Sequence, residues 1–462
     1  MLKLSKAWAT KVQQSFSRNL QKKTINERDS FRVKIITQFY PPDYAATGQL
    51  IQELADQLGK HNLQIDIFTG QPGYAFTKAQ APRLEKINHL KVKRSRTSRL
   101  WSKRICGKAI NGVIFCLRAG LHLLKHWRES DVLLLTTAPP FLSIVGYLTN
   151  LCFGTPYVCL VYDLYPDVAT ELGVIAPEHP IAKLWDKVNG LVWQKAQGIV
   201  VLSSTMKERI VAKHPQIDSK ISVIHNWANA NWIKPLPKQQ NWFAREYGIT
   251  KKFTVLYSGN LGRCHDLDTI VGAINLLKDE PIKFVFIGAG AKQEICSKTV
   301  VNLGLNNCCF LPYQDRENLP YSLTACDLAF VSIAPGMEGI VAPSKLYGIM
   351  AAGRAIAAIC EPQSYLRQLI TKAGCGACFE HNDSQGLAAF IRSLALNPTQ
   401  AVAMGQAGRQ YLEAHFTPEI IARQYTEVLN PVVKPTESHF FWQKFSPNSD
   451  ENISTERMSL KK

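Results

Sequence analysis

The sequence predicts an α/β protein built from two doubly wound halves. Short apolar, β-branched runs alternate with helix-like stretches over most of the 462 residues, which indicates parallel strands joined by crossover helices. The alternation pauses at residues 229–240, where two prolines and several amides are typical of a linker, and it then resumes. The length of the chain also favours two or three domains over one.

The first half begins with a β-branched run at residues 31–38 (FRVKIITQ), which is predicted to be a strand. Pro41 and Pro42 follow this run, and a helix is expected over residues 47–60. Five further strands of this half are expected at 63–69, 131–136, 157–162, 198–202 and 222–225.

The second half repeats this rhythm, with helices to about residue 430. Its strands are expected at 253–258, 283–288, 308–311, 328–332 and 355–360. The predicted organisation is a basic lead-in at 1–30, a first domain at 31–230, a second domain at 231–430 and a disordered tail at 431–462. The tail is assigned from its polar composition, which is rich in Pro, Ser and Asn.

The net charge of +18 is concentrated near the start of the chain. Residues 1–128 hold roughly 24 Lys and Arg but roughly 7 Asp and Glu, and the remainder is close to neutral. Such asymmetry indicates an anionic partner on that side, whether nucleic acid, a membrane surface or a phosphorylated substrate, unless it only aids solubility. Nucleic acid is disfavoured, because the basic region has neither a recognisable reading motif nor a ladder of aromatic residues.

Residues 105–127 combine apolar residues at helical spacing with lysines and arginines. Such a helix suits an anionic bilayer surface or a position against a sheet, and the sequence leaves both open. A membrane-spanning helix is not expected, since no uninterrupted apolar run reaches about 18 residues. Residues 1–30 lack the apolar region of a secretory signal.

Three loops that follow predicted strands carry candidate binding residues. In doubly wound domains, ligands meet the carboxyl ends of strands, where glycine turns and helix N-termini present backbone N–H groups. Residues 38–49 place Gly48 at a helix start, where its amide could face an anion or a sugar. Residues 258–266 (SGNLGRCHD) contain Gly259 and Gly262, followed by Arg263. A guanidinium beside a glycine turn suits a diphosphate.

The segment 336–353 (GMEGIVAPSKLYGIMAAG) gives the strongest signal. The Glu338 carboxylate can accept hydrogen bonds from sugar hydroxyls. Ser344 and Lys345 precede a predicted helix and could hold phosphate oxygens.

Several motifs in order resemble a known family. YSGNLGR, GAG, CDLAFVS, EG and APSKLYGIMAAGR follow an N-terminal QFYPPDYAATGQ and a central VIHNW. This order resembles the GT4-type retaining glycosyltransferases of the GT-B fold, in the branch that builds bacterial polysaccharides and lipid-linked saccharides, over roughly residues 33–428. The resemblance implies two Rossmann-like domains facing across a cleft. The first would take the acceptor and the second the nucleotide-sugar donor.

The implied reaction moves a hexosyl or N-acetylhexosaminyl group, with retention, from a UDP-linked sugar to a saccharide or lipid-linked acceptor. Such a transfer belongs to polysaccharide or glycoconjugate biosynthesis. The expected partners are the nucleotide sugar, the acceptor and an anionic membrane surface, but no nucleic acid. No cofactor or metal is required, because no D-x-D pair lies in a donor loop. The expected location is cytoplasmic, peripheral on the inner face of the membrane.

The resemblance also assigns roles to individual residues. The expected catalytic residues are Arg263, Lys345, Glu338 and Asp163. The expected donor-binding residues are Gly48, Gly259, Asn260, Tyr313 and Ser344.

The sequence departs from the family pattern at four positions. The usual Arg and Lys of the diphosphate clamp fall on Asn260 and His265, which makes Arg263 the replacement cation. Gly348 stands where a ribose-binding Glu is usual. Asp163 follows a tyrosine where the family often has a histidine.

Two other functions stay open on the sequence alone. A sugar-nucleotide epimerase on the same fold would interconvert UDP-sugars without an acceptor. A catalytically silent nucleotide-sugar-binding scaffold would account for the altered clamp and for the absent second Glu.

Overall fold

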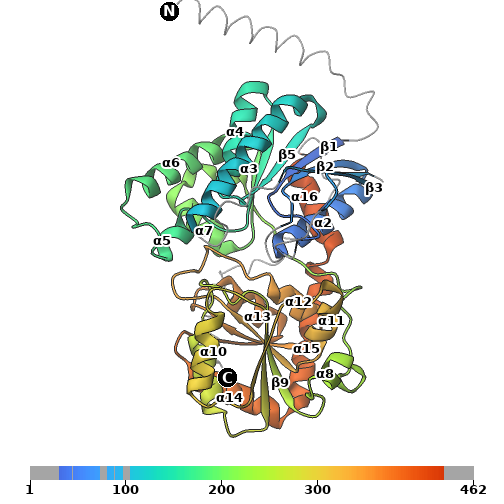
Figure 1. Ribbon diagram of the computed structural model, residues 1–462, viewed down its shortest axis with the longest axis vertical. Helices are drawn as coiled ribbons and strands as arrows, with labels where there is room; N and C mark the ends of the chain where they lie inside the picture. The colour runs from blue at the N-terminus through green and yellow to red at the C-terminus, as the bar shows by residue number, and fades with distance from the viewer. Residues whose placement is uncertain (1–30, 44, 73–80, 88, 97–104, 431–462) are drawn as a thin grey trace, which may run out of the picture. The chain divides into compact units, whose positions relative to one another are not determined.

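The computed structural model describes residues 31–43, 45–72, 81–87, 89–96 and 105–430. Figure 1 shows two sheets, each with helices packed around it. The predicted α/β class with two Rossmann-like sheets is therefore confirmed. The predicted lead-in at 1–30 and the predicted tail at 431–462 lie outside the described residues.

The first sheet has eight strands in the order β3-β4-β2-β1-β5-β6-β7-β8. All neighbours pair in parallel except β3 and β4, which are antiparallel. The strands are β1 (Phe31–Ile36), β2 (Leu63–Thr69), β3 (Leu84–Ile87), β4 (Leu90–Arg94), β5 (Val132–Thr136), β6 (Tyr157–Val161), β7 (Gly198–Val201) and β8 (Ile221–Val223).

The second sheet has six strands, all parallel, in the order β11-β10-β9-β12-β13-β14. They are β9 (Phe253–Ser258), β10 (Ile282–Ile287), β11 (Cys308–Leu311), β12 (Leu328–Ser332), β13 (Ala355–Ile359) and β14 (Gly376–Phe379). Every residue of β12 and β13 is buried, as expected where helices cover both faces of a parallel sheet.

The sequence did not predict the β3–β4 hairpin or β14. Strand β3 is mostly exposed, and β14 consists of four residues (GACF), so neither gives a long apolar run. Each other predicted strand is found within a few residues of its expected bounds.

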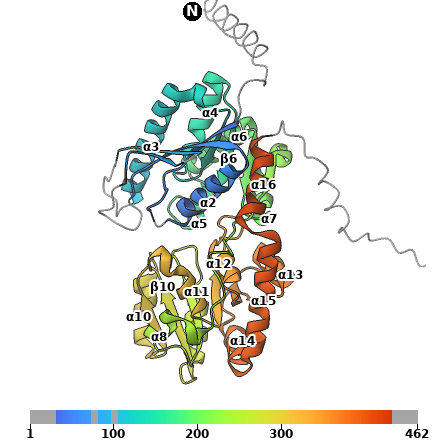
Figure 2. The same cartoon turned by 90° about the vertical axis from the view of Figure 1, so that its right-hand side faces the viewer.

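The helices of the first half lie on two faces of its sheet. The strand order reverses at β1, so right-handed crossovers place α2 on one face and α4 and α6 on the other. Helix α3 packs on α4, and α4 packs on α6 (Figures 1 and 2). The helices are α2 (Ala46–Lys60), α3 (Ile105–His126), η1 (Trp127–Glu129), α4 (Leu142–Phe153), α5 (Asp167–Glu171), α6 (Pro180–Lys195), α7 (Ser204–Lys213) and η2 (Pro215–Lys220).

The remaining helices follow β8 in the chain. They are η3 (Lys238–Gln240), α8 (Trp242–Glu246), α9 (Asp268–Leu276), α10 (Gln293–Asn302), η4 (Arg316–Asn318), α11 (Leu319–Thr324), α12 (Lys345–Ala351), α13 (Tyr365–Ala373), α14 (Ser384–Leu396), α15 (Pro398–His415) and α16 (Pro418–Leu429).

The last helix differs from the prediction in its packing. Residues 418–429 were assigned to the second domain, but α16 packs against α2, beside the first sheet. The Gln197 side chain also donates to the Val428 carbonyl oxygen at 3.2 Å. An amphipathic pattern predicts a buried helix face without naming its partner. The other predicted boundaries stay predictions.

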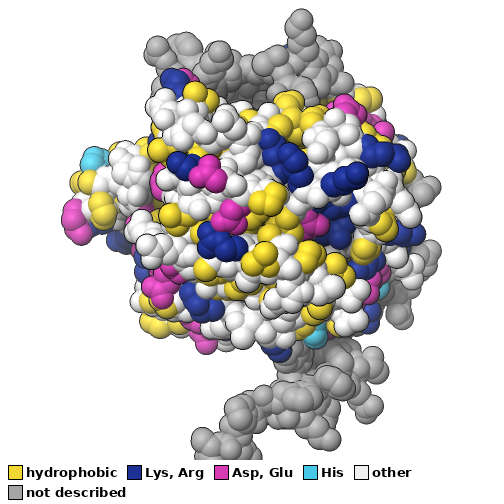
Figure 3. All heavy atoms as spheres, turned by 90° about the horizontal axis from the view of Figure 1, so that it is seen from below, with side chains coloured by type: hydrophobic (Ala, Val, Ile, Leu, Met, Phe, Trp, Pro, Cys, Tyr) yellow, Lys and Arg dark blue, Asp and Glu magenta, His cyan; other side chains and the backbone are white. Residues whose placement is uncertain are grey.

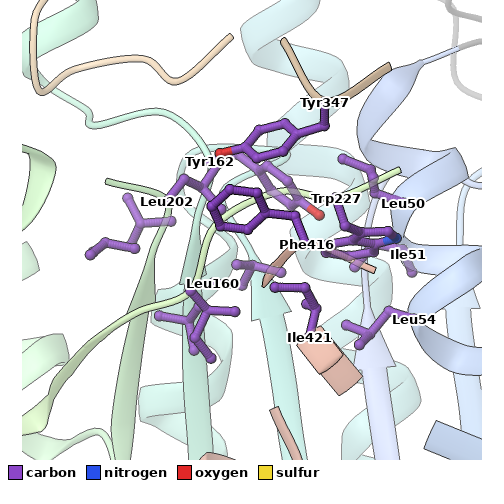
Figure 4. Packing of buried hydrophobic residues seen from close by; sticks show 14 of the residues in the cluster. Leu50, Ile51, Leu54, Leu160, Tyr162, Leu202, Trp227, Tyr347, Phe416 and Ile421 are labelled. Carbon is purple, nitrogen blue, oxygen red and sulfur yellow. The ribbon is translucent and has the colours of Figure 1, made fainter. Parts of the chain in front are cut away.

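An aromatic cluster lies where the chain crosses between the sheets (Figure 4). Tyr347 of α12 and Phe416 meet edge to face, with ring centroids 5.2 Å apart. The Tyr347 hydroxyl lies 3.3 Å from His225 Nδ1, and Trp227 packs edge to face on Tyr425 of α16. The crossing segments are thus part of one buried core.

Candidate functional site

Two glycine turns pack against each other at the carboxyl ends of β9 and β10. Gly259 and Gly288 have φ values of +124° and +133°, which favour glycine. The Gly259 amide donates to the Ile287 carbonyl oxygen at 2.8 Å. A Cβ atom on Gly288 would lie 2.0 Å from the Gly259 carbonyl oxygen. Close approach of the two backbones therefore requires glycine at 288, and the positive φ requires it at 259.

The Lys345 side chain lies beside these turns. Its Nζ lies 3.8 Å from the centre of the Tyr257 ring, shielded from solvent and without a hydrogen-bond partner among the described residues. A Cβ atom on Gly259 would lie 3.7 Å from Lys345 Cε. Burial lowers the pKa of Lys345 to about 7. A buried amine without a partner is costly, and an anion at the glycine turn would relieve that cost.

His265 does not supply a second cation at this point. Its Nδ1 donates to the Ser332 carbonyl oxygen at 2.7 Å. Burial, together with the positive charge of Lys345, lowers the pKa of His265 to about 3, so its ring is neutral.

Sequence reasoning missed Tyr257 and Lys292. Tyr257 stacks under the Lys345 ammonium and donates from its hydroxyl to the Asn260 carbonyl oxygen at 2.9 Å. Lys292 Nζ donates to the His265 carbonyl oxygen at 2.9 Å, which brings a cation to the loop that follows β9. The signal for Lys292 was its place two residues after the Gly288–Gly290 turn.

Arg263 lies on the same loop, but its side chain is exposed. An exposed guanidinium could reach a ligand only by reorienting. The role of Arg263 stays a prediction.

Glu338 lies against the first half of the chain. Its Oε1 accepts a hydrogen bond from Thr205 Oγ1 at 2.7 Å, and its carbonyl oxygen accepts from Arg209 Nη1 at 3.1 Å. Burial raises the pKa of the Glu338 carboxyl, and hydrogen bonds from Ser364 and Thr205 oppose this rise. A Cβ atom on Gly339 would lie 2.7 Å from the Thr205 carbonyl oxygen. The Glu-Gly pair thus joins the two halves.

Asp163 lies on the other side of the same junction. It forms an isolated antiparallel bridge with Val341, and the Leu164 amide donates to the Ile340 carbonyl oxygen at 2.9 Å. Burial raises the pKa of Asp163 to about 6. Burial raises the pKa of Cys264, on the loop after β9, and the nearby Asp163 charge adds to that rise. The structure therefore brings Asp163 close both to that loop and to the 338–341 segment.

Three of the predicted donor-binding residues lie together: Gly259, Asn260 and Tyr313. A Cβ atom on Gly288 would lie 3.4 Å from Tyr313 Cε1, and one on Gly290 would lie 2.6 Å from Asn260 Oδ1. Ser344 precedes α12 and makes no side-chain cap hydrogen bond there.

Gly48 lies in α2 of the first half, not in the loops that contain Gly259 or Ser344. Its amide already donates to the Ala45 carbonyl oxygen at 2.9 Å. A Cβ atom on Gly48 would lie 3.0 Å from the Tyr40 nitrogen, which gives a local packing reason for glycine. Its binding role stays a prediction.

The structure also locates Gly348, which stands where a ribose-binding Glu is usual. A Cβ atom on Gly348 would lie 3.4 Å from Leu323 Cδ1, so this position faces α11. Among the described residues, no group of three or more His, Cys, Asp or Glu side chains is placed to hold a metal.

The second half matches a known family. Residues 239–411 match the model for glycosyl transferases group 1. A probable glycosyltransferase of Pseudomonas aeruginosa, WbjE, is 27% identical over 346 residues, which span 74% of this chain and 84% of that protein. A putative colanic acid biosynthesis glycosyl transferase of Escherichia coli K12, WcaI, is 33% identical over 175 residues, 38% of this chain and 42% of that protein.

Solved structures share the whole fold. A sucrose-phosphate synthase from Thermosynechococcus elongatus has a TM-score of 0.68 at 17% identity, covering 87% of this chain and 99% of that one. The Anabaena protein HepE in complex with UDP and glucose has a TM-score of 0.66 at 15% identity, with the same coverage. The resemblance to group 1 glycosyltransferases and the GT-B architecture are both confirmed. Retention of configuration stays a prediction.

Proposed function

We propose that this chain transfers a hexosyl or N-acetylhexosaminyl unit from a UDP-sugar, because residues 239–411 match the model for glycosyl transferases group 1 and WbjE is similar over 74% of the chain. The acceptor would be a hydroxyl of a saccharide or lipid-linked saccharide, and anomeric configuration would be retained. One observation carries the proposal: the unpartnered Lys345 ammonium beside the paired glycine turns. The UDP complexes of HepE support a uridine nucleotide as the donor.

The main task of the site would be to stabilise the departing diphosphate. As the bond between the anomeric carbon and the phosphate oxygen breaks, negative charge grows on the leaving group. Lys345, shielded from solvent, would meet this charge with little reorganisation. The exposed Arg263 would close over the outer phosphate. The positive field does not depend on a bound metal, so none is proposed.

The acceptor hydroxyl would attack the anomeric carbon from the face that the diphosphate leaves. The new glycosidic bond forms there, and the hydroxyl proton passes to a phosphate oxygen. Asp163 would accept a hydrogen bond from the acceptor and orient it. Glu338 would contact the donor sugar if its hydrogen bond with Thr205 were exchanged.

The direct test is a panel of UDP-sugars with a short saccharide acceptor, followed by UDP release and by NMR of the product anomer. We expect acceptor-dependent release and a retained anomer. Isomerisation of the donor without acceptor would instead identify an epimerase, and binding without turnover would identify a scaffold. An inverted anomer would contradict the retaining mechanism.

We also propose that the protein works at the cytoplasmic face of a membrane, on the evidence of the basic first part of the chain. Among the described residues, no helix has both the length and the apolar character needed to cross a bilayer. A peripheral position would give access to a lipid-linked acceptor.

A further inference from the structure

Three neighbouring helices of the first half expose a large apolar surface, which we call the α3–α4–α6 face. Its most exposed members are Leu117 at 64% and Leu184 at 62% of their full areas. The residues that define the face are Ile110, Val113, Leu117, Leu121 and Leu124 on α3, Leu148 and Leu151 on α4, and Ile181, Leu184 and Leu191 on α6.

The exposed residues of α3 form one stripe. They recur at intervals of three or four residues, which places them on one side of a helix. Phe115, Ala119 and Leu123 lie on the opposite side and are buried. The helix therefore has two apolar sides, and packing on the sheet uses only one of them. Since α3 packs on α4 and α4 on α6, the exposed residues are contributed by adjacent helices (Figure 1).

The charge of these helices favours an anionic partner. The three sequences contain six Lys or Arg residues and a single acidic residue, Asp186. Asp186 lies 3.5 Å from the Lys213 ammonium, so its charge is already offset. Lys125, Lys187 and Lys195 are exposed. A neighbouring acid outside the helices, Glu178, pairs with Lys183 at 2.5 Å. An apolar surface bordered by more cations than carboxylates suits the headgroups and acyl chains of an anionic bilayer.

An aromatic pair lies where α3 and α4 end. Trp127 and Phe153 stack with ring centroids 4.9 Å apart, and the Arg128 guanidinium lies 4.8 Å from the centre of the Trp127 ring. Tryptophan beside a cation is typical of residues at the depth of lipid headgroups.

A second set of aromatic residues connects this face with the candidate site. Trp185 of α6 stacks on Phe141 at 4.5 Å and on Tyr165 at 5.7 Å. Tyr165 lies two residues from Asp163; burial raises the pKa of Tyr165, and the nearby charge of Asp163 adds to that rise. The three aromatic rings thus form a series from Phe141, at the N-terminal end of α4, to Tyr165, close to Asp163.

We propose that the α3–α4–α6 face lies on an anionic lipid bilayer. We further propose that Phe141, Trp185 and Tyr165 guide the apolar part of a lipid-linked acceptor toward Asp163. The second step rests on the proposed transferase function, whereas the first does not.

Vesicle flotation of the full chain tests the surface. Vesicles of phosphatidylcholine with phosphatidylglycerol are compared with phosphatidylcholine alone. We expect binding to the anionic vesicles, and at least about a tenfold loss in a Leu117→Ser/Leu121→Ser variant, because two exposed leucines no longer enter the acyl region. The matched control is Val301→Ser/Leu396→Ser, which replaces residues exposed at 73% and 81% in the second half.

Two results would overturn the surface proposal: no flotation of the native chain, or equal flotation of both double variants. Analytical ultracentrifugation identifies the competing occupant. A dimer that dissociates in Leu117→Ser/Leu121→Ser, without vesicle binding, would assign the face to a second copy of the chain.

The acceptor path needs a separate readout. Trp185→Ala should raise KM at least about fivefold for a lipid-linked acceptor, with little change for a short water-soluble saccharide, and Trp185→Phe should restore it. Equal KM changes for both acceptors would contradict the path. Flotation without transfer to either acceptor would refute the proposed function and leave the surface proposal standing.

Discussion

Two buried lysine ammonium groups, Lys34 in the first half and Lys345 in the second, have different surroundings. Lys34 of β1 lies 3.9 Å from Asp66 and 3.8 Å from Glu129, and it donates to the His126 carbonyl oxygen at 3.3 Å. Lys345 of the second half lies over the Tyr257 ring and has no hydrogen-bond partner in the described part of the chain. Burial lowers the pKa of both amines, but two carboxylates oppose the change at Lys34 alone. A buried cation without a carboxylate beside it indicates a ligand-binding site, whereas a buried cation paired with carboxylates indicates a structural role.

The outer surfaces differ in a parallel way. Helices α3 and α4 of the first half expose apolar residues and contain no acidic residue, and α6 has Asp186 and the neighbouring Lys183–Glu178 ion pair. In the second half, exposed apolar residues such as Ile295 lie among ion pairs, including Lys298–Glu294 at 2.7 Å and Arg392–Glu280 at 2.6 Å. Figure 3 shows basic and acidic side chains interspersed with apolar ones on the face seen from below. The exposed helices of the first half thus suit a lipid surface, whereas the second half suits a soluble anionic ligand.

The largest effect is expected at Lys345. Lys345→Ala should lower kcat/KM about 10²–10³-fold, because it removes the shielded charge that meets the leaving diphosphate. Steady-state UDP release measures the loss. The matched control is Lys298→Ala, an exposed lysine of the same half. Near-normal turnover in Lys345→Ala would remove this residue from the mechanism.

Lys34 should behave in the opposite manner. Lys34→Met should lower the free energy of unfolding by about 1–3 kcal/mol, since Asp66 and Glu129 lose their buried partner. Activity per folded molecule should stay near that of the native chain. Urea denaturation and UDP release on the same samples measure the two quantities. A selective loss of activity with unchanged stability would contradict the structural role of Lys34.

Donor affinity should depend on pH through Lys345. With a pKa of about 7 in the free protein, the ammonium form is lost as pH rises, so the affinity for UDP should fall up to about tenfold for each unit above 7. Lys345→Arg, which stays charged, should remove this slope. Calorimetric titration with UDP between pH 6 and 9 measures it, and identical slopes in both proteins would contradict the assignment.

The same pKa gives a stability prediction with a definite sign. Between pH 7 and the ordinary lysine value of 10.5, the unfolded chain binds the proton and the ligand-free folded chain does not. The contribution of Lys345 to stability therefore increases with pH in that window. Lys345→Met should flatten the rise in thermal denaturation series, and an unchanged profile would count against the lowered pKa.

Arg263→Ala should have a smaller effect than Lys345→Ala. The guanidinium is exposed, so solvent and salt screen its interaction with phosphate, and we expect roughly a three- to tenfold loss of kcat/KM. Raising the salt concentration should shrink the difference from the native chain. A loss as large as that of Lys345→Ala would mean that the loop closes and buries Arg263.

Much of the fold was predictable because parallel strands buried on both faces read as short apolar runs. Strand β9 was predicted at its observed bounds, and β12 likewise. The hairpin strand β3 was missed because its exposed, mixed residues carry no such pattern. Helix α16 was predicted as a helix but assigned to the wrong sheet, because periodicity does not name the surface that a helix covers.

The site was predictable only in part. The glycine turn at Gly259 and the cation at Lys345 were identified from the sequence, and the structure places them side by side. Tyr257 and Lys292 were missed, because a tyrosine inside a strand and a lysine after a turn are ordinary features until their neighbours are known.

The sequence by itself determined the class of fold, the family and the residue types at the strand ends, because hydrophobic period and motif order are local properties. Only the tertiary structure decided that Lys345 has no hydrogen-bond partner among the described residues, and that Glu338 accepts a hydrogen bond from Thr205. It also decided that the second apolar side of α3 stays exposed. The burial of a side chain and its pairing depend on segments far apart in the chain. Their effect on the pKa of that side chain therefore follows only from the packing of those segments.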